Sequence, residues 1–281
     1  MNCIYCQNYE ISQQGKGKEI TTEELAEIFL KQQEKDVENI NLVTPTSYVY
    51  QIIEAIKIAR KNGLKIPIVY NTNSFENLET IKLLDGYVDI YLPDLKYYFN
   101  NLGEKYSKVK NYFDVASSVI KEMERQVGKT VFDENGIMKK GMIIRHLVLP
   151  NNLENSKMVL KWIKENMSKD TYVSIMAQYF PTYLAKTDEK YEELSRKLTK
   201  KEWEEIEQYI EDLDLKNGYI QELGEHEEEY VPKWWWDNCL TFFMKSKKKN
   251  LKKIYTIKIH YDILSTVKKE VIKWLKRINI L

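Results

Sequence analysis

Short apolar runs alternate with stretches of helical periodicity along this sequence, and this alternation constrains the fold more than any other feature. Each run is mostly apolar on both faces, as a buried parallel strand requires. The runs are Ile40–Val43, Ile66–Tyr70, Tyr87–Leu92, Met142–Leu149 and Tyr172–Met176. Strand and helix repeated in this way predict an α/β protein with a parallel sheet and right-handed crossovers. The sheet is either doubly wound or a complete or partial (β/α) barrel.

The helices between these runs carry local start and stop signals. Thr21 is followed by Glu24, and Thr199 by Glu202. This spacing is typical of a capping box, in which each side chain bonds the other residue's backbone N–H. Gly63 and Gly128 follow two other helical stripes, where glycine commonly ends a helix.

Charge divides the chain into two segments. Residues 1–232 carry 30 basic and 39 acidic residues, whereas residues 233–281 carry 13 basic and 3 acidic ones. An acidic body is poorly suited to nucleic-acid phosphates, so we expect no nucleic-acid partner. We therefore expect one domain over 1–232 and a basic C-terminal extension over 233–281. We interpret the extension mainly as an appended element without a binding role; the alternative is docking to an acidic partner, nucleic acid or an anionic membrane surface.

Apolar length and cysteine number bear on the compartment. No apolar run approaches the ~18 residues of a membrane span, so no membrane association is expected. No signal peptide is visible at the N-terminus. Three cysteines do not form a disulfide scaffold, and a reducing, cytoplasmic location is the default.

Polar residues follow four of the predicted strands, and Arg145 and His146 lie inside the run Met142–Leu149, toward the edge where parallel sheets bind ligands. Taken singly, each has an ordinary explanation, because Asn and Thr form turns, Asp94 and Lys96 could be a surface pair, and His146 could be a hydrogen-bonded core residue. Taken together, they predict a binding site at this edge. The set comprises Thr44, Thr46, Asn71, Asn73, Asp94, Lys96, Arg145, His146 and Gln178.

Cys3 and Cys6 form a C-x-x-C pair at the start of the chain. A redox pair needs a helix N-terminus to lower the thiol pKa, and here a polar stretch follows. A zinc site needs two more ligands at close spacing, and the third cysteine, Cys239, is remote. An iron–sulfur cluster needs three or four thiolates, of which two are near. Spacing alone leaves these alternatives open, together with the absence of any role.

The segment Cys3-Ile4-Tyr5-Cys6-Gln7-Asn8-Tyr9-Glu10-Ile11-Ser12 resembles the radical S-adenosylmethionine (radical SAM) signature, at its second and third cysteines. The resemblance is greatest to the subgroup related to pyruvate formate-lyase activating enzyme. It covers roughly residues 1–232, through Leu42–Thr46, Ile68–Asn73, Asp89–Lys96, Arg145–Pro150 and Gln221–Gly224.

This resemblance implies a partial (β/α)6 barrel of radical SAM type that binds a [4Fe-4S] cluster and S-adenosylmethionine. Cys3 and Cys6 would be metal ligands, and Tyr5 would lie near the adenine. Residues 44–46 occupy the place where many relatives carry Gly-Gly-Glu. The strand-end set named above would line the cofactor pocket, with Arg145, His146 and Gln178 at its floor.

The implied activity is that of an oxidoreductase. Reductive cleavage of S-adenosylmethionine would give a 5′-deoxyadenosyl radical that abstracts hydrogen from a protein glycine or a small molecule. The implied partners are a glycyl-radical protein substrate and a reductant such as flavodoxin or ferredoxin. The alternative, from a different class, is a non-catalytic α/β binding module without a cluster.

The sequence departs from the family pattern at its start. The first cysteine of the signature and the first barrel strand would both lie upstream of Met1, which suggests a truncated chain start; the alternative is a protein that lacks both. Lacking its first strand, the barrel would leave Ile40–Val43 as an unpaired edge, which predicts poor solubility and possible inactivity of this chain. In the extension, Tyr255–Ile259 alternates like a strand, and residues 267–277 suggest a basic helix.

Overall fold

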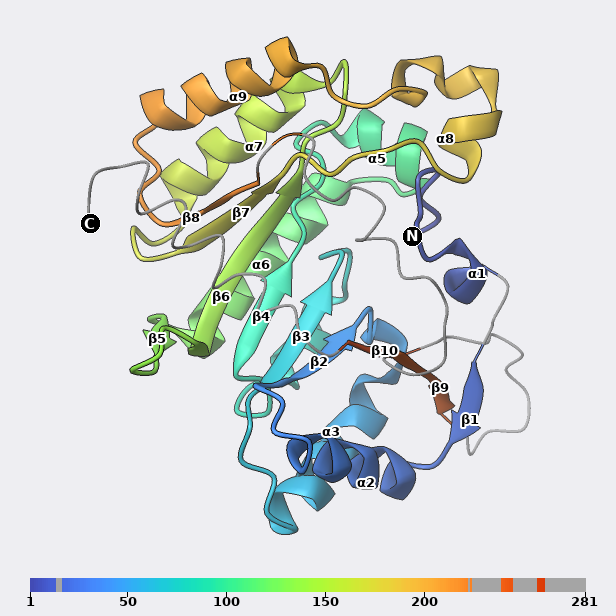
Figure 1. Ribbon diagram of the computed structural model, residues 1–281, viewed down its shortest axis with the longest axis vertical. Helices are drawn as coiled ribbons and strands as arrows, with labels where there is room; N and C mark the ends of the chain where they lie inside the picture. The colour runs from blue at the N-terminus through green and yellow to red at the C-terminus, as the bar shows by residue number, and fades with distance from the viewer. Residues whose placement is uncertain (14–16, 222, 224–238, 245–256, 261–281) are drawn as a thin grey trace.

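The computed structural model describes residues 1–13, 17–221, 223, 239–244 and 257–260 (Figure 1). The predicted C-terminal helix over 267–277 lies outside the described residues. The strands are β1 (Lys18–Ile20), β2 (Ile40–Val43), β3 (Ile68–Thr72), β4 (Ile90–Pro93), β5 (Val131–Phe132), β6 (Met138–Leu147), β7 (Tyr172–Met176), β8 (Gly218–Ile220), β9 (Cys239–Met244) and β10 (Ile257–His260).

The helices follow the strands in the predicted alternation. The capping boxes at Thr21 and Thr199 are both present, and Gly128 caps α6, so these sequence signals are confirmed. The helices are α1 (Tyr9–Ser12), α2 (Thr22–Gln33), α3 (Val49–Lys61), α4 (Leu78–Lys82), α5 (Asn100–Ser107), α6 (Tyr112–Val127), α7 (Leu153–Asn166), α8 (Leu184–Thr187) and α9 (Lys200–Asp212), with the 3-10 turns η1 (Thr46–Tyr48) and η2 (Glu189–Leu194).

One open sheet contains all of these strands, in the order β1-β9-β10-β2-β3-β4-β6-β7-β8, with β5 paired to β6. The pairs from β2 through β8 on this path are parallel. Figure 1 shows α5, α6 and α7 on one side of this parallel part, with α9 beside α7. The predicted α/β fold with a partial barrel is therefore confirmed.

The two faces of the sheet differ in what they pack against. Tyr70 of β3, Tyr91 of β4 and Ile144 of β6 pack with the helices in the main hydrophobic cluster, and we call this the helix face. Their neighbours Val69, Ile90, Leu92 and Ile143 form a separate small cluster on the opposite, inner face. Because side chains alternate along a strand, these positions fix the face of every later residue on the same strands.

The edge of the parallel sheet differs from the sequence-based expectation. β10 pairs antiparallel with β2, joining Lys258 to Val43 and His260 to Asn41. β9 pairs antiparallel with β10, and β1 pairs parallel with β9. The prediction that Ile40–Val43 is an unpaired edge is thus wrong, because strands from the C-terminal extension complete its hydrogen-bond ladder. The strand predicted within that extension is confirmed over Ile257–His260.

Candidate active site at the strand ends

The inner face ends in a layer of polar side chains that follows its apolar layer. We call the group Asn71, Asp94, Lys96 and Arg145 the strand-end layer. Asn71, Asp94 and Arg145 continue the alternation of Val69, Leu92 and Ile143, so all three belong to the inner face. The Arg145 guanidinium donates to Asn71 Oδ1 at 2.7 Å and lies 2.6 Å from Asp94 Oδ1. Lys96 Nζ donates to the other carboxylate oxygen of Asp94 at 2.7 Å. The sequence correctly predicts that these strand-end residues meet.

The charges of this layer are mutually compensating but not fully partnered. Burial by itself raises the pKa of Asp94, but Arg145 and Lys96 outweigh it and hold that pKa below its ordinary value. The Nε of Arg145 is buried and has no hydrogen-bond partner among the described residues. A buried donor without a partner costs free energy, which a ligand oxygen would offset.

Tyr112 of α6 ties two strand ends together beneath this layer. Its hydroxyl lies 2.9 Å from the Asn73 carbonyl and 2.8 Å from the Asp94 carbonyl. It also accepts the backbone N–H of Lys96 at 3.0 Å. Tyr112 is fully buried, so it fixes the backbone that carries Asp94 and Lys96. No sequence motif singles out Tyr112.

A second buried carboxylate, Glu76, lies where β2 and β3 end. Its Oε1 accepts hydrogen bonds from the hydroxyls of Thr46 at 2.8 Å, Tyr70 at 3.2 Å and Thr72 at 2.5 Å. Its Oε2 is buried and has no partner among the described residues. Burial raises the pKa of Glu76, although the three hydroxyl donors act in the opposite direction. Sequence reasoning missed Glu76, whose only signal was its place shortly after a predicted strand.

The cysteine pair forms a tight turn in which the Cys6 N–H donates to the Cys3 carbonyl at 3.2 Å. No disulfide joins the two thiols. Cys3 Sγ accepts a hydrogen bond from the Ser107 hydroxyl at 3.0 Å. Ser107 contacts the Tyr97 hydroxyl at 2.8 Å, which in turn contacts the Tyr5 hydroxyl. A chain of buried hydroxyl groups therefore leads to the sulfur of Cys3.

The environment of Cys3 bears on the alternatives for the pair. Burial raises the pKa of the Cys3 thiol, and Lys96 is near enough for its positive charge to oppose that rise. A thiol oxidoreductase requires a lowered thiol pKa, so this environment argues against that alternative. The hydrogen-bond chain from Cys3 through Ser107 also includes Tyr97, the residue next to Lys96, and so connects the cysteine turn with the strand-end layer.

The two thiols supply part of the ligand set of a cysteine-bound iron–sulfur cluster. Two free thiols at one turn match two of the three or four thiolates that such a cluster takes. Within the described ranges, no group of three His, Cys, Asp or Glu side chains is placed to hold a metal ion. The residues therefore supply two ligands of the implied set, and the part of the chain that is described supplies no third.

Several predicted site residues lie apart from the layer or have other local roles. His146 is on the helix face, where its ring nitrogens bond the Leu95 carbonyl at 2.7 Å and the Ser156 hydroxyl of α7 at 2.9 Å. The expectation that His146 forms the pocket floor beside Arg145 does not fit this geometry, because consecutive strand residues point to opposite faces. Burial lowers the pKa of His146 to about 4.

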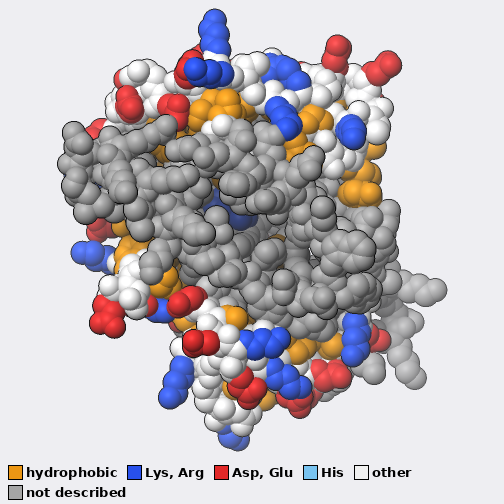
Figure 2. Space-filling view, viewed as in Figure 1, with side chains coloured by type: hydrophobic (Ala, Val, Ile, Leu, Met, Phe, Trp, Pro, Cys, Tyr) orange, Lys and Arg blue, Asp and Glu red, His pale blue; other side chains and the backbone are white. Residues whose placement is uncertain are grey.

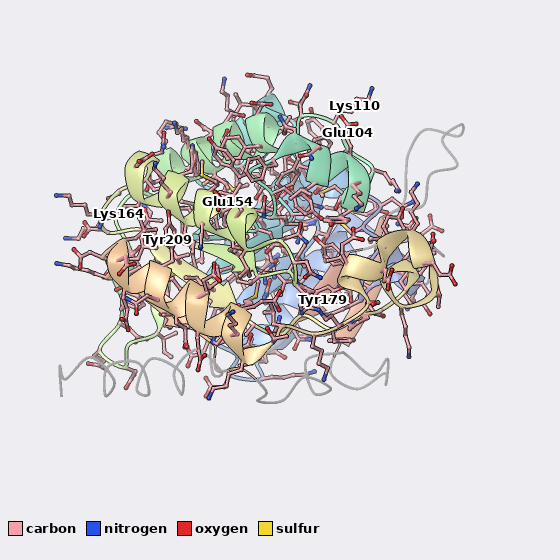
Figure 3. The ribbon with its side chains drawn as sticks, turned by 90° about the horizontal axis from the view of Figure 1, so that it is seen from above. Glu104, Lys110, Glu154, Lys164, Tyr179 and Tyr209 are labelled. Carbon is pink, nitrogen blue, oxygen red and sulfur yellow. The ribbon has the colours of Figure 1, made fainter. Side chains whose placement is uncertain are left out.

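The remaining predicted residues are placed as follows. Tyr5 is buried, with its ring edge-on to Tyr179, the residue labelled in Figure 3. Thr44 is exposed and has a left-handed backbone at the end of β2. The side chain of Asn73 forms a local turn with the Phe75 N–H. Gln178 follows β7 and bonds Gln221.

A separate cavity lies elsewhere in the molecule. It has a volume of about 400 Å³ and is lined by residues from the end of α6 and the segments that precede β5 and β7. The cavity lies at the end of the sheet where the parallel strands begin, and none of the predicted site residues lines it. Most of its charged groups are paired, as Arg125 is with Asp85 and Glu124 with Thr171. We therefore place the candidate site at the strand ends.

Comparison with known proteins identifies the class that this fold and site define. The family model described as the radical SAM superfamily matches residues 1–140. A curated relative from Methanocaldococcus jannaschii, the uncharacterized protein MJ0674, is 35% identical over 222 residues. That match covers 74% of this chain but only 57% of the relative's length. The chain belongs to the radical SAM superfamily.

Solved structures agree at the level of the fold. SuiB of Streptococcus suis, bound to precursor peptide SuiA, has 15% identity and a TM-score of 0.52, with 79% of this chain and 46% of SuiB covered. SuiB bound to S-adenosylmethionine gives a TM-score of 0.50 at 14% identity, with coverages of 79% and 44%. A domain of pyruvate-formate lyase-activating enzyme from Bacteroides vulgatus has 15% identity and a TM-score of 0.44, with 63% of this chain and 94% of that domain covered. This TM-score is too low to assign the chain to that subgroup.

Charged side chains of both signs share the surface of the described residues. Figure 2 shows Lys and Arg side chains interspersed with Asp and Glu side chains over the described parts of one face. Seen from above in Figure 3, Lys164 of α7 and Tyr209 of α9 mark two adjacent helices at one side of the molecule. Within the described ranges, no helix combines the length and apolar character needed to cross a membrane.

Proposed function

We propose that this chain is the scaffold of a cytoplasmic radical SAM enzyme in which Cys3 and Cys6 ligate an iron–sulfur cluster and the strand-end layer binds S-adenosylmethionine. The observation that carries the proposal is the hydrogen-bond chain from Cys3 Sγ through Ser107 to Tyr97, the residue next to Lys96, which joins the cysteine turn to the Asn71–Asp94–Arg145 layer. When bound, the cluster supplies the electron that cleaves the sulfonium C–S bond of S-adenosylmethionine.

The protein's own residues bind and orient this ligand. Lys96 and Arg145 present positive charge on the inner face, and the free Nε of Arg145 is a donor suited to a carboxylate oxygen. Asp94 holds both cations in place, and Asn71 fixes the guanidinium from the neighbouring strand. The apolar inner layer of Val69, Leu92 and Ile143 beneath them limits the access of water.

The cluster part of the proposal is tested by metal content. The chain is reconstituted anaerobically with iron and sulfide, and both are measured in the wild type and in Cys3→Ala and Cys6→Ala. Each substitution should remove most of the bound iron. Cys239→Ala is the matched control and should leave iron content unchanged. If the wild type holds no more iron than the variants, the non-catalytic binding module becomes the better description.

The ligand part is tested by binding and turnover. Asn71→Ala should weaken the binding of S-adenosylmethionine by about tenfold, because it releases the Arg145 guanidinium, and should leave iron content intact. Asn166→Ala on α7, whose side chain bonds Trp162 and Lys121, is the control. Formation of 5′-deoxyadenosine with a reductant such as flavodoxin or ferredoxin would establish the reaction, and its absence from a cluster-loaded chain would contradict it.

We further propose a protein or peptide as the hydrogen donor, in particular a glycine residue, with a small molecule as the alternative. The support is the resemblance of the Cys3–Ser12 segment to glycyl-radical activating enzymes and the shared fold with SuiB, which has been solved with its precursor peptide. Deuterium placed at the α-carbon of glycine in a candidate acceptor protein should appear in 5′-deoxyadenosine. Deuterium transfer only from a small molecule would contradict the protein substrate.

A further inference from the structure

We propose that Tyr5, Tyr97 and Ser107 form a hydrogen-bond relay that ends on the Cys3 sulfur and makes an iron–sulfur cluster bound there easier to reduce. This inference rests on the proposed function, because it assigns a role toward the cluster that Cys3 would ligate. Ser107 and Tyr97 are positioning residues, since they act through the sulfur of Cys3. Neither belongs to the set of site residues predicted from the sequence.

The first step of the argument is the geometry of the relay. The Ser107 hydroxyl lies 3.0 Å from Cys3 Sγ, and Ser107 Oγ lies 2.8 Å from the Tyr97 hydroxyl. The Tyr97 hydroxyl in turn contacts the Tyr5 hydroxyl. Ser107 and Tyr97 are fully buried and Tyr5 is 8% exposed, so water has little access to these hydroxyl groups. The hydroxyl groups therefore form one continuous chain that reaches the sulfur.

The backbone holds the serine against the cysteine turn. The Asn2 N–H donates to the Ser107 carbonyl at 3.0 Å, and the Ile4 N–H donates to the Tyr106 carbonyl at 2.9 Å. These two bonds flank Cys3 and join its segment to the last turn of α5. The approach of Ser107 Oγ to Cys3 Sγ is therefore set by the fold of the backbone.

The direction of the hydrogen bonds follows from the number of available hydrogens. A metal-bound cysteine is a thiolate, which has no hydrogen and can only accept. Ser107 donates its single hydrogen to Cys3, so Ser107 Oγ accepts from Tyr97, and the Tyr97 oxygen accepts from Tyr5. Hydrogen bonds aligned in this way polarise one another, which strengthens the last bond, to the sulfur.

The relay stabilises the negative charge that reduction adds. Hydrogen bonds to the sulfurs are among the features that set the reduction potential of an iron–sulfur cluster. An added electron increases the negative charge on the cysteine sulfurs, and a donor directed at Cys3 Sγ stabilises that charge where little water can do so. Removing the donor should therefore lower the reduction potential.

The test measures the midpoint potential of the cluster, reconstituted anaerobically in the full 281-residue chain without S-adenosylmethionine. A chemical reductant is added stepwise with redox mediators, and the reduced cluster is quantified by electron paramagnetic resonance. Ser107→Ala should lower the potential by about 59 mV, which is a tenfold change in the one-electron reduction equilibrium. Tyr97→Phe and Tyr5→Phe should give progressively smaller decreases. Tyr91→Phe is the matched control, because its buried hydroxyl bonds Gln126 instead, and it should leave the potential unchanged.

The outcomes separate this inference from the proposed function. If the wild type holds no cluster, the proposed function fails and this inference fails with it. If the cluster forms and Ser107→Ala keeps the wild-type potential, the inference is overturned while cluster binding stands. If Ser107→Ala does not fold or holds no iron, the Tyr97→Phe and Tyr5→Phe variants decide, and wild-type potentials in both overturn the relay. A shift of equal size in Tyr91→Phe would attribute the change to general loosening of the core and would also overturn it.

Discussion

Arg145 and Asp94 meet across two neighbouring strands, with the guanidinium 2.6 Å from the carboxylate and only 22% and 14% of the two side chains exposed. Arg145→Gln would leave Asp94 with Lys96 as its one cationic partner, at a position where water is largely excluded. We expect a loss of about 1–3 kcal/mol in the free energy of unfolding, measured by urea denaturation. Arg125→Gln, which breaks the exposed pair with Asp85, should cost under about 1 kcal/mol. Equal losses in the two variants would contradict this prediction.

The hydroxyl of Tyr112 gives a second stability prediction. Tyr112→Phe keeps the ring but leaves the carbonyls of Asn73 and Asp94 and the N–H of Lys96 without their shared partner. Because these groups are mostly buried, the substitution should destabilise the protein by about 1–3 kcal/mol. The exposed Tyr50 provides the control, and Tyr50→Phe should change the stability by less than about 0.5 kcal/mol. A neutral effect at Tyr112 would mean that the strand ends do not need this hydroxyl.

His146 predicts how stability depends on pH. Its pKa is lowered to about 4 in the folded protein, against 6.5 as its ordinary value. Between these values the unfolded chain binds the proton and the folded protein does not, so stability falls as the pH drops through this window. The contribution between pH 7 and pH 5 is about 2 kcal/mol. Urea denaturation of His146→Asn should show a correspondingly smaller loss over the same interval, and an unchanged pH dependence would exclude His146 as its source.

The pairing of β10 with β2 predicts the effect of shortening the chain. Removal of residues 233–281 deletes β9 and β10 and exposes the ladder of Ile40–Val43, which should cause self-association. Light scattering and hydrogen exchange at Asn41–Val43 would detect this. Removal of residues 261–281 alone retains both strands and serves as the control. If both shortened chains remain monomeric and equally protected, the β10 pairing does not protect this edge.

The parallel core of the fold was predictable because each buried strand is a continuous apolar run. The boundaries of the strands were less predictable. β3 begins at Ile68 rather than Ile66 because Pro67 has no N–H to donate to the sheet. β6 begins four residues before the predicted run because β5 pairs with its first residues. The strands of the C-terminal extension join an edge about 200 residues away in sequence, and no local pattern specifies such a contact.

The candidate site was predictable where it depended on topology. Asn71, Asp94 and Arg145 come together because parallel strands end at a common edge. His146 was misplaced because its neighbour Arg145 already occupies the inner face, and alternation directs His146 to the helices. Glu76 was missed because its three donors come from Thr46, Tyr70 and Thr72, and their convergence is visible only in three dimensions.

The position of β10 also has a consequence for biosynthesis. β2 is made early, whereas the strand that pairs with it ends at His260, about 200 residues further along the chain. At about 5–20 residues synthesised per second, the edge of β2 would remain unpaired in the nascent protein for roughly 10–40 s. During that interval, ribosome-associated chaperones or a strand from a neighbouring nascent chain can bind this edge before β10 is made.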